Sequence, residues 1–308
     1  LLPATSVFFG GGTPSLLPAD LLCSILDSIE VAPGAEVTVE CNPENVTPAL
    51  ARSYARAGVN RVSIGVQSMA PRVLVGLGRQ HDPACVPTAL AMMADAGIVN
   101  LSVDLIYGGA GENDADWAQT LDTVLGFDPG PSHVSAYALT VEPGTPLALD
   151  LARHPDDDVQ ADRYAMADDR LAEAGFGWYE ISNWAKPGRE CRHNQLYWSQ
   201  GNYLGVGAAA HSHWRGRRGW NMRTPERYMK AVAGAHDLEA GVEFLNETQR
   251  RMEGLQLSLR TRLGVPACSL APDPRVDGLF EVSQGRAVLT RSGRMLANEV
   301  SARLIVEP

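Results

Sequence analysis

The sequence lacks any apolar run of the roughly 18 to 20 residues that a membrane-spanning helix requires. It also lacks an initial basic stretch followed by a hydrophobic one, which a secretory signal would show. These absences predict a protein without a membrane span and with a cytoplasmic location. Leu1 is not a methionine and a strand-like segment follows almost at once, so we expect that an upstream part is missing.

Cysteine is scarce. The 5 cysteines are odd in number and far apart, which argues against a disulfide framework and suits a reducing compartment. They form no local metal-binding motif, so we expect free thiols. These residues are Cys23, Cys41, Cys85, Cys191 and Cys268.

Positive charge is also limited, because 26 Lys and Arg stand against 36 Asp and Glu, for a formal net charge of -10. The basic residues are scattered apart from one short cluster at Arg215, Arg217 and Arg218. Nucleic acid is therefore not an expected partner. With 45% hydrophobic and 20% charged residues, the 308-residue chain can bury a large core in one large or two unequal domains.

Short β-branched or apolar runs alternate with helical patterns up to about residue 185, which predicts an α/β fold with a parallel sheet. Ala-Gly pairs at Ala57, Ala96 and Ala174 indicate repeated helix ends before the next strand. An open sheet and a complete or partial barrel both satisfy this pattern, and both place the working site at the carboxyl ends of the strands. The expected strands are Ser6–Phe9, Glu36–Cys41, Arg61–Gly65, Asn100–Ile106, His133–Ala138 and Trp178–Ile181.

Three regions are expected along the chain. Residues 1–185 form the partial barrel, and residues 186–245 form an aromatic and glycine-rich covering segment without clear periodicity. Residues 246–308 are predicted to form a small α+β winged-helix-like domain. Its expected elements are a helix at Thr248–Leu259, a hairpin at Leu279–Thr290 that turns at Gln284-Gly285, and a closing helix after Ser292-Gly293.

The sharpest local feature is the glycine triplet Gly10-Gly11-Gly12, followed by Thr13-Pro14-Ser15, between the first strand and a helix. Without side chains, its backbone could approach a ligand and hold a carboxylate or phosphate by N–H groups. A tight strand-to-helix turn explains the same glycines.

Polar residues fall at or near the ends of successive strands. They are Glu40, Gln67 and Asp104, and in a parallel barrel they would converge on one mouth. A carboxylate within an apolar strand is costly unless it is hydrogen-bonded, so Asp104 requires a partner or a ligand. The alternative is a satisfied core carboxylate.

Five ordered motifs resemble the radical S-adenosylmethionine (SAM) superfamily, in its oxygen-independent coproporphyrinogen III oxidase-like family. The resemblance covers about residues 5 to 300 and implies a partial (β/α)6 barrel whose first part is missing. The motifs are Phe8-Phe9-Gly-Gly-Gly-Thr-Pro-Ser, Glu40-Cys-Asn-Pro-Glu, Arg61-Val-Ser-Ile-Gly-Val-Gln-Ser, Gly78-Arg-Gln-His and Asp104-Leu-Ile-Tyr-Gly.

The resemblance implies a set of SAM-contacting residues. Arg79 is chemically suited to the methionine carboxylate, and Asp104 or Glu40 to ribose hydroxyls; a surface ion pair is the alternative role for Arg79. The sequence departs from the family after Tyr107, where Gly-Gly-Ala-Gly replaces a proline-containing turn. The implied contacts are Gly11, Gly12, Thr13, Glu40, Gln67, Arg79, Asp104 and Ala138.

The family also binds a [4Fe–4S] cluster through a Cys-x-x-x-Cys-x-x-Cys motif, and this chain has no such motif. We therefore expect no metal ligands in this chain. The resemblance implies that the full-length protein holds the cluster and cleaves SAM to a radical, with an external electron donor.

Two functions share this scaffold: heme-binding chaperones, and the oxygen-independent oxidase that decarboxylates coproporphyrinogen III. The segment Cys191-Arg-His-Asn-Gln-Leu-Tyr-Trp198 resembles the chaperone branch, which implies heme as cargo and a heme-acceptor protein as partner, including one at a membrane surface. A third hypothesis, from a different functional class, is a module that binds SAM without catalysing a reaction.

An imidazole can ligate heme iron while aromatic faces pack on the macrocycle. This makes His193, Asn194, Tyr197 and Trp198 candidate heme contacts. In the alternative, His193 and Asn194 brace a loop and the aromatics fill the core. For the pair His211 and His213, we expect structural hydrogen bonds rather than metal binding.

Overall fold

The computed structural model describes residues 2–306, and the chain divides after His193 into two compact units. The helices and strands of the first unit are β1 (Ala4–Phe9), α1 (Ala19–Asp27), β2 (Val31–Cys41), α2 (Pro48–Ala57), β3 (Arg61–Gln67), α3 (Pro71–Gly76), α4 (Cys85–Asp95), β4 (Asn100–Tyr107), α5 (Asp114–Leu125), β5 (His133–Ala138), α6 (Asp157–Glu173), β6 (Gly177–Glu180) and β7 (Asn183–Ala185).

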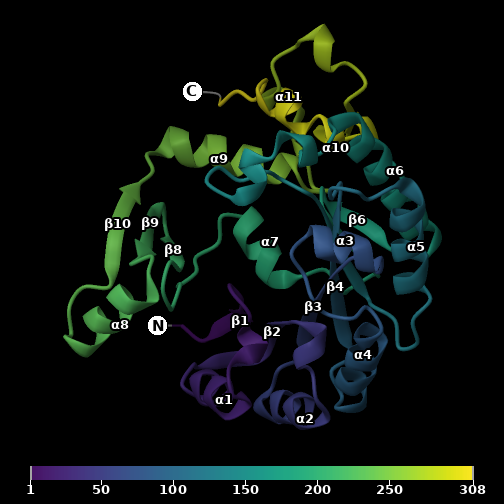
Figure 1. Cartoon of the computed structure of the whole chain (residues 1–308). Coiled ribbons are helices and arrows are strands. Elements are labelled where there is room, and N and C mark those ends of the chain that lie inside the picture. The colour runs from purple at the N-terminus through teal and green to yellow at the C-terminus, as the bar shows by residue number, and fades with distance from the viewer. Residues whose placement is uncertain (1, 307–308) are drawn as a thin grey trace. The chain divides into compact units, whose positions relative to one another are not determined.

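Strands β1 to β5 are parallel and lie side by side in chain order, with α1, α2, α4, α5 and α6 outside the curved sheet (Figure 1). Such sequential order is that of a barrel, since a doubly wound sheet reverses its strand order. The predicted partial barrel is therefore confirmed.

All six expected strands occur in this sheet, with ends that differ by a few residues. A seventh, β7, lies between β5 and β6 and is antiparallel to both. The sequence did not reveal it because it has only 3 residues, too few to show an alternating pattern.

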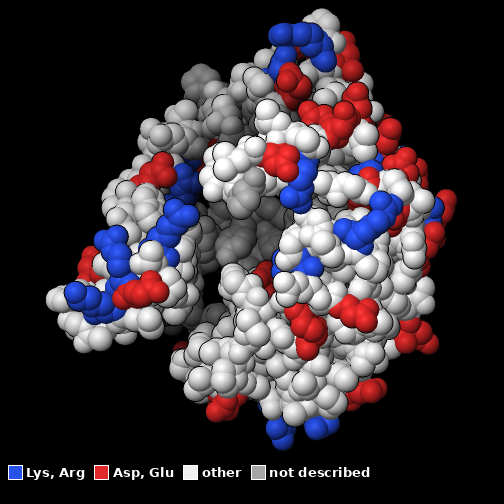
Figure 2. All heavy atoms as spheres, in the orientation of Figure 1, with Lys and Arg blue, Asp and Glu red and all other residues white. Residues whose placement is uncertain are grey.

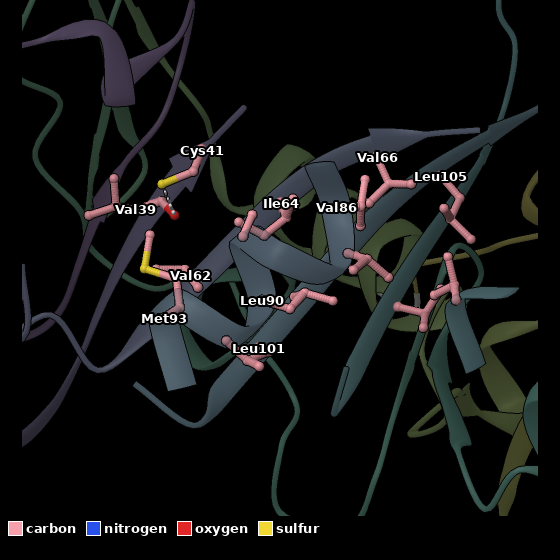
Figure 3. Packing of buried hydrophobic residues seen from close by; sticks show 14 of the residues in the cluster. Val39, Cys41, Val62, Ile64, Val66, Val86, Leu90, Met93, Leu101 and Leu105 are labelled. Carbon is pink, nitrogen blue, oxygen red and sulfur yellow. Dashed lines mark hydrogen bonds between the residues drawn. The ribbon is translucent and has the colours of Figure 1, made fainter. Parts of the chain in front are cut away.

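The core of the first unit lies between the sheet and its outer helices (Figure 3). Ile64 on β3 and Leu101 on β4 face Leu90 and Met93 of α4, and all four are at most 1% exposed. Burying a side chain of this size stabilises the fold by roughly 1.5–3 kcal/mol. This apolar layer leaves the other face of the same strands to polar residues.

The turns between helices and strands follow the predicted Ala-Gly signals. Gly58, Gly97 and Gly175 have φ angles of 95°, 94° and 81°. Only glycine adopts this left-handed conformation without strain, so these positions end α2, α4 and α6 and return the chain to the sheet.

The second unit begins at Asn194, within α7 (Arg192–Trp198). Residues 186–245, expected to be a covering segment without periodicity, contain, besides α7, a three-stranded antiparallel sheet in the order β10-β9-β8 and a further helix. These elements are β8 (His211–Trp214), β9 (Arg217–Asn221), α8 (Pro225–Ala233) and β10 (Glu239–Phe244). The strands have only 4 to 6 residues and few aliphatic side chains, so they give no alternating apolar signal.

The C-terminal part has the predicted helix–hairpin–helix pattern. The hairpin turns at Gln284 and Gly285, with φ angles of 50° and 76°. The closing helical segment begins at Arg291 rather than after Gly293, because the Thr290 hydroxyl caps it by accepting from the Gly293 N–H at 3.1 Å. Its elements are α9 (Glu247–Leu259), β11 (Val265–Pro266), β12 (Phe280–Ser283), β13 (Arg286–Leu289), α10 (Arg291–Met295) and α11 (Ala297–Ser301).

Acidic and basic side chains are interspersed over the face shown in Figure 2. No helix within residues 2–306 is long and apolar enough to cross a membrane.

Candidate cofactor and heme sites

The glycine loop after β1 exposes its backbone. Gly11 and Gly12 have φ angles of 81° and 64°, and a Cβ at either position would meet no atom within 4 Å. Glycine is therefore favoured by backbone conformation rather than by crowding, since other residues pay roughly 1–2 kcal/mol in this region. The Gly11 N–H donates to Glu40 Oε2 at 3.2 Å. Thr13 follows in the chain, directly before a 3₁₀ turn at Pro14–Leu16.

Two carboxylates lie on the polar face of the sheet near its carboxyl end. Glu40 is on β2, and Asp104 on β4 accepts a hydrogen bond from Ser63 Oγ at 2.8 Å. Burial raises the pKa of Glu40, and the negative charge of Asp104 raises it further. Burial also raises the pKa of Asp104, although the hydroxyls of Ser63 and Ser135 oppose the rise. The pair would gain from a cationic or hydroxyl-bearing ligand.

Gln67 is buried at the end of β3 and has a φ of 63°, which is rare for a residue with a side chain. The β3–β4 register shifts between Gly65 and Gln67. The Gln67 Nε2 would lie 2.9 Å from a Cβ at Gly65, so glycine makes room for the amide. Backbone strain of this kind collects at ligand sites.

The other two predicted SAM contacts are placed differently. Ala138 ends β5 and pairs with Tyr107. Arg79 is exposed, and its backbone N–H donates to the Leu74 carbonyl at 2.8 Å. Within residues 2–306 its guanidinium has no recorded contact with the carboxylates. The structure thus brings together Gly11, Glu40, Gln67 and Asp104, and leaves Arg79 apart.

Sequence reasoning missed several residues of the polar face, among them Ser63, Ser135 and Arg61. Arg61 is 2% exposed, and its Nε has no hydrogen-bond partner among the described residues. Its positive charge opposes the rise that burial gives to the pKa of Glu40 and Asp104. The available signal was that Arg61, Ser63 and Gln67 fall on alternate positions of β3, but only the sheet register shows which partners these residues meet.

At the amino ends of the same strands, the segment that begins at Cys191 is tied to Glu36. The Glu36 carboxylate accepts from the backbone N–H of Arg192 at 3.1 Å and of His193 at 3.0 Å, and from Cys191 Sγ at 3.6 Å. The Arg192 guanidinium donates to the carbonyls of Thr5 and Gly34. These contacts fasten the segment to β1 and β2.

All four candidate heme contacts, His193, Asn194, Tyr197 and Trp198, lie on α7. His193 is 9% exposed, its Nδ1 lies 2.9 Å from Ser6 Oγ, and its ring stacks on Phe8 at 5.0 Å. Burial lowers the pKa of His193, which favours the neutral imidazole. Tyr197 is 39% exposed, and its ring lies 4.5 Å from that of Tyr203. The contacts of His193 are therefore those expected if it braces a loop, which is the alternative to heme binding.

The two histidines of β8 differ. His213 is buried, with Nδ1 2.9 Å from the Gly201 carbonyl and Nε2 accepting from the Gly216 N–H at 3.1 Å. These are the expected structural hydrogen bonds. His211 is exposed and lies beside Trp220, with ring centroids 6.1 Å apart.

The cysteines do not fit an iron–sulfur cluster. All five are free, and burial raises the pKa of Cys41 to about 12, whereas cluster ligands are thiolates. Among residues 2–306, no group of three or more His, Cys, Asp or Glu side chains is placed to hold a metal ion. The glycine loop and carboxylates, in contrast, fit SAM, which carries ribose hydroxyls and two positive groups.

Comparisons with known proteins show the family to which the chain belongs. Residues 2–124 match the family model of the Radical SAM superfamily. The chain is 42% identical over 315 residues to the heme chaperone HemW of Mycobacterium tuberculosis (strain CDC 1551 / Oshkosh), with 97% of this chain and 80% of the relative covered. It is 29% identical over 326 residues to the heme chaperone HemW of Bacillus subtilis (strain 168), with 98% and 86% covered.

Among solved structures, coproporphyrinogen III oxidase (HemN) from Escherichia coli, a radical SAM enzyme, matches with a TM-score of 0.83. The match covers 97% of this chain and 77% of the oxidase at 19% sequence identity. At this identity the likeness shows a shared fold.

Proposed function

We propose, from the premise that this chain belongs to the HemW family of heme chaperones within the radical SAM superfamily, that it binds heme and delivers it to acceptor proteins. The observation that carries the proposal is the 42% identity to a heme chaperone across 97% of the chain. The likeness to the oxidase is one of fold, so it does not favour porphyrinogen decarboxylation.

The glycine loop and the polar residues at the carboxyl ends of the parallel strands would hold SAM. The backbone of Gly11, Gly12 and Thr13 would contact its methionine part, and Arg79 would pair with the methionine carboxylate. Glu40 and Asp104 would accept hydrogen bonds from ribose hydroxyls, which would offset the cost of keeping two nearby carboxylates charged. Gln67 and Ala138 complete the proposed contact set.

Reductive cleavage of SAM is the chemistry that a [4Fe–4S] cluster supplies in this superfamily. The described residues offer no ligand set for it, so we derive no reaction step from this chain. An electron donor, a cytoplasmic location and an acceptor protein, including one at a membrane surface, belong to the same proposal.

Heme binding would involve α7. The aromatic rings of Tyr197 and Trp198 would pack on the macrocycle, while His193 and Asn194 would supply polar contacts. Because the His193 ring is buried against Phe8 and Ser6, direct ligation by His193 would require this segment to move.

The test is a heme titration of the protein followed by Soret absorbance, with coproporphyrinogen III turnover assayed in parallel. The chaperone reading predicts stoichiometric heme binding without turnover, weakened in Tyr197→Ala and unchanged in the exposed control His154→Ala. Turnover to protoporphyrinogen IX without heme affinity would instead establish the oxidase, and SAM binding with neither property would indicate a non-catalytic module.

A further inference from the structure

The second unit carries an accessible imidazole at His211, next to aromatic side chains. His211 is exposed at the start of β8, and no hydrogen bond or ion pair to its ring is recorded within residues 2–306. His213 has both ring nitrogens engaged. A neutral imidazole nitrogen without an internal partner is what heme iron requires of an axial ligand.

Aromatic rings lie on the same face of the sheet as His211. Trp220 is its cross-strand partner on β9, and directly opposed residues of antiparallel strands project to one face. Tyr203 pairs with His213, which is two residues from His211 and therefore on that face too. Tyr197 extends the row, because its ring packs edge-on against Tyr203 at 4.5 Å.

A glycine allows a neighbouring stretch of chain to approach the backbone of His211 closely. The stretch from Tyr203 to Gly205 runs along β8, with the Gly205 N–H donating to Ser212 Oγ at 2.9 Å. A Cβ at Gly205 would lie 2.2 Å from the His211 carbonyl oxygen, so no larger residue fits without displacing the strand. The stretch from Tyr203 to Gly205 therefore lies directly against β8, and it brings Tyr203 to the face of the sheet that His211 shares.

A positive charge is available at the same end of the sheet. Arg223 follows β9 and is exposed, and it has no ion pair among the described residues. The Ala209 N–H donates to the Met222 carbonyl at 2.9 Å, which places the residue before Arg223 against the loop that leads into His211. Heme carries two propionates, so this cation complements it.

We propose that His211 is an axial ligand of heme iron, with the macrocycle lying on the aromatic face formed by Tyr197, Tyr203, His211 and Trp220. The inference rests on the proposed function as a heme-binding protein and names the residue that holds the iron. It also assigns Tyr197 a packing role at the edge of the macrocycle and gives His193 no part in ligating the iron.

The test is a titration of ferric heme into the wild type, His211→Ala and the matched control His236→Ala, an exposed histidine of the same unit. The proposal predicts at least a tenfold weaker affinity and an altered Soret maximum for His211→Ala, and wild-type behaviour for the control. Free imidazole should restore the wild-type Soret maximum in His211→Ala, which a merely structural role would not produce.

A second variant separates this inference from the proposed function. If His193→Ala loses the Soret signature while His211→Ala titrates like the wild type, the protein still binds heme but the ligand assignment is wrong. If the wild type binds no heme at all, the proposed function fails and the ligand assignment fails with it.

Discussion

Polar residues at the amino ends and at the carboxyl ends of the parallel strands differ in their surroundings. At the amino ends, His133 has Nδ1 2.8 Å from Ser102 Oγ and Nε2 2.6 Å from the Tyr179 hydroxyl, which in turn accepts from the Cys191 N–H at 3.1 Å. At the carboxyl ends, Glu40 and Asp104 are two carboxylates whose pKa values are raised by burial.

The difference is that Glu40 and Asp104, although hydrogen-bonded, lie close enough for the charge of one to raise the pKa of the other. A buried polar group that has internal hydrogen bonds stabilises the fold, whereas a carboxylate beside another carboxylate costs free energy until a ligand arrives. Residue type alone does not separate the two cases, since Glu36 and Glu40 are four residues apart on β2. We therefore expect polar residues at one end of the barrel to serve its stability and those at the other end to serve binding.

The largest expected effect comes from Glu36→Ala at the amino ends. It leaves the N–H groups of Arg192 and His193 without their acceptor, and each unpaired buried donor costs about 1–3 kcal/mol. We expect a loss of about 3 kcal/mol in the free energy of unfolding, measured by urea denaturation. The control Glu173→Ala, at an exposed position of α6, should change the free energy of unfolding by less than about 0.5 kcal/mol. Similar losses in both variants would show that Glu36 stabilises the fold no more than an exposed carboxylate does.

The next effect is a pH dependence from His133. Burial lowers its pKa well below 6.5, so below pH 6.5 the unfolded chain binds a proton that the folded chain does not. Stability should therefore fall as the pH drops from 6.5 toward the folded pKa, by at most about 1.4 kcal/mol per pH unit for this group. His133→Gln should flatten the profile of urea midpoints against pH; an unchanged slope would show that His133 is not responsible.

At the carboxyl ends of the strands, the expected pH dependence of stability has the opposite sign. Because burial raises the pKa of Asp104, the charged carboxylate costs stability at neutral pH. Asp104→Asn should therefore stabilise the protein without ligands at pH 7, by about 1 kcal/mol, a typical gain when a costly functional group is removed. Thermal unfolding of the ligand-free protein measures this change, and a lower melting temperature would place Asp104 with the internally satisfied residues.

The smallest effect is expected from Ser63→Ala, which removes one hydrogen bond to Asp104. We expect a change of about 0.5–1 kcal/mol in the free energy of unfolding. In the double variant with Asp104→Asn the two changes should not add, because the residues are in contact. Additive changes would mean that the interaction free energy between Ser63 and Asp104 is zero.

The sequence predicted those parts of the fold that have a local signal. The strands of the barrel are apolar on alternate positions, and the Ala-Gly turns require a left-handed residue, so both could be read from the chain. The sheet β8–β10 and strand β7 could not, because their short segments are held by cross-strand pairing that no local pattern encodes.

The sequence predicted those residues of the candidate site that lie at the ends of strands. Glu40 and Asp104 follow from the rule that carboxyl ends of parallel strands converge. The role of Glu36 could not be predicted, because its partners at residues 191–193 are more than 150 residues away in sequence. All of the proposed SAM contacts, including those of Glu40 and Asp104, remain predictions.

The most direct measurement of the difference between the two ends is the SAM-induced rise in melting temperature of the wild type, Glu36→Gln and Asp104→Asn. We expect SAM to raise the melting temperature of the wild type and of the less stable Glu36→Gln by similar amounts, and that of Asp104→Asn little or not at all. An equal rise in Asp104→Asn, or its loss in Glu36→Gln, would contradict the assignment of binding to the carboxyl ends and stability to the amino ends.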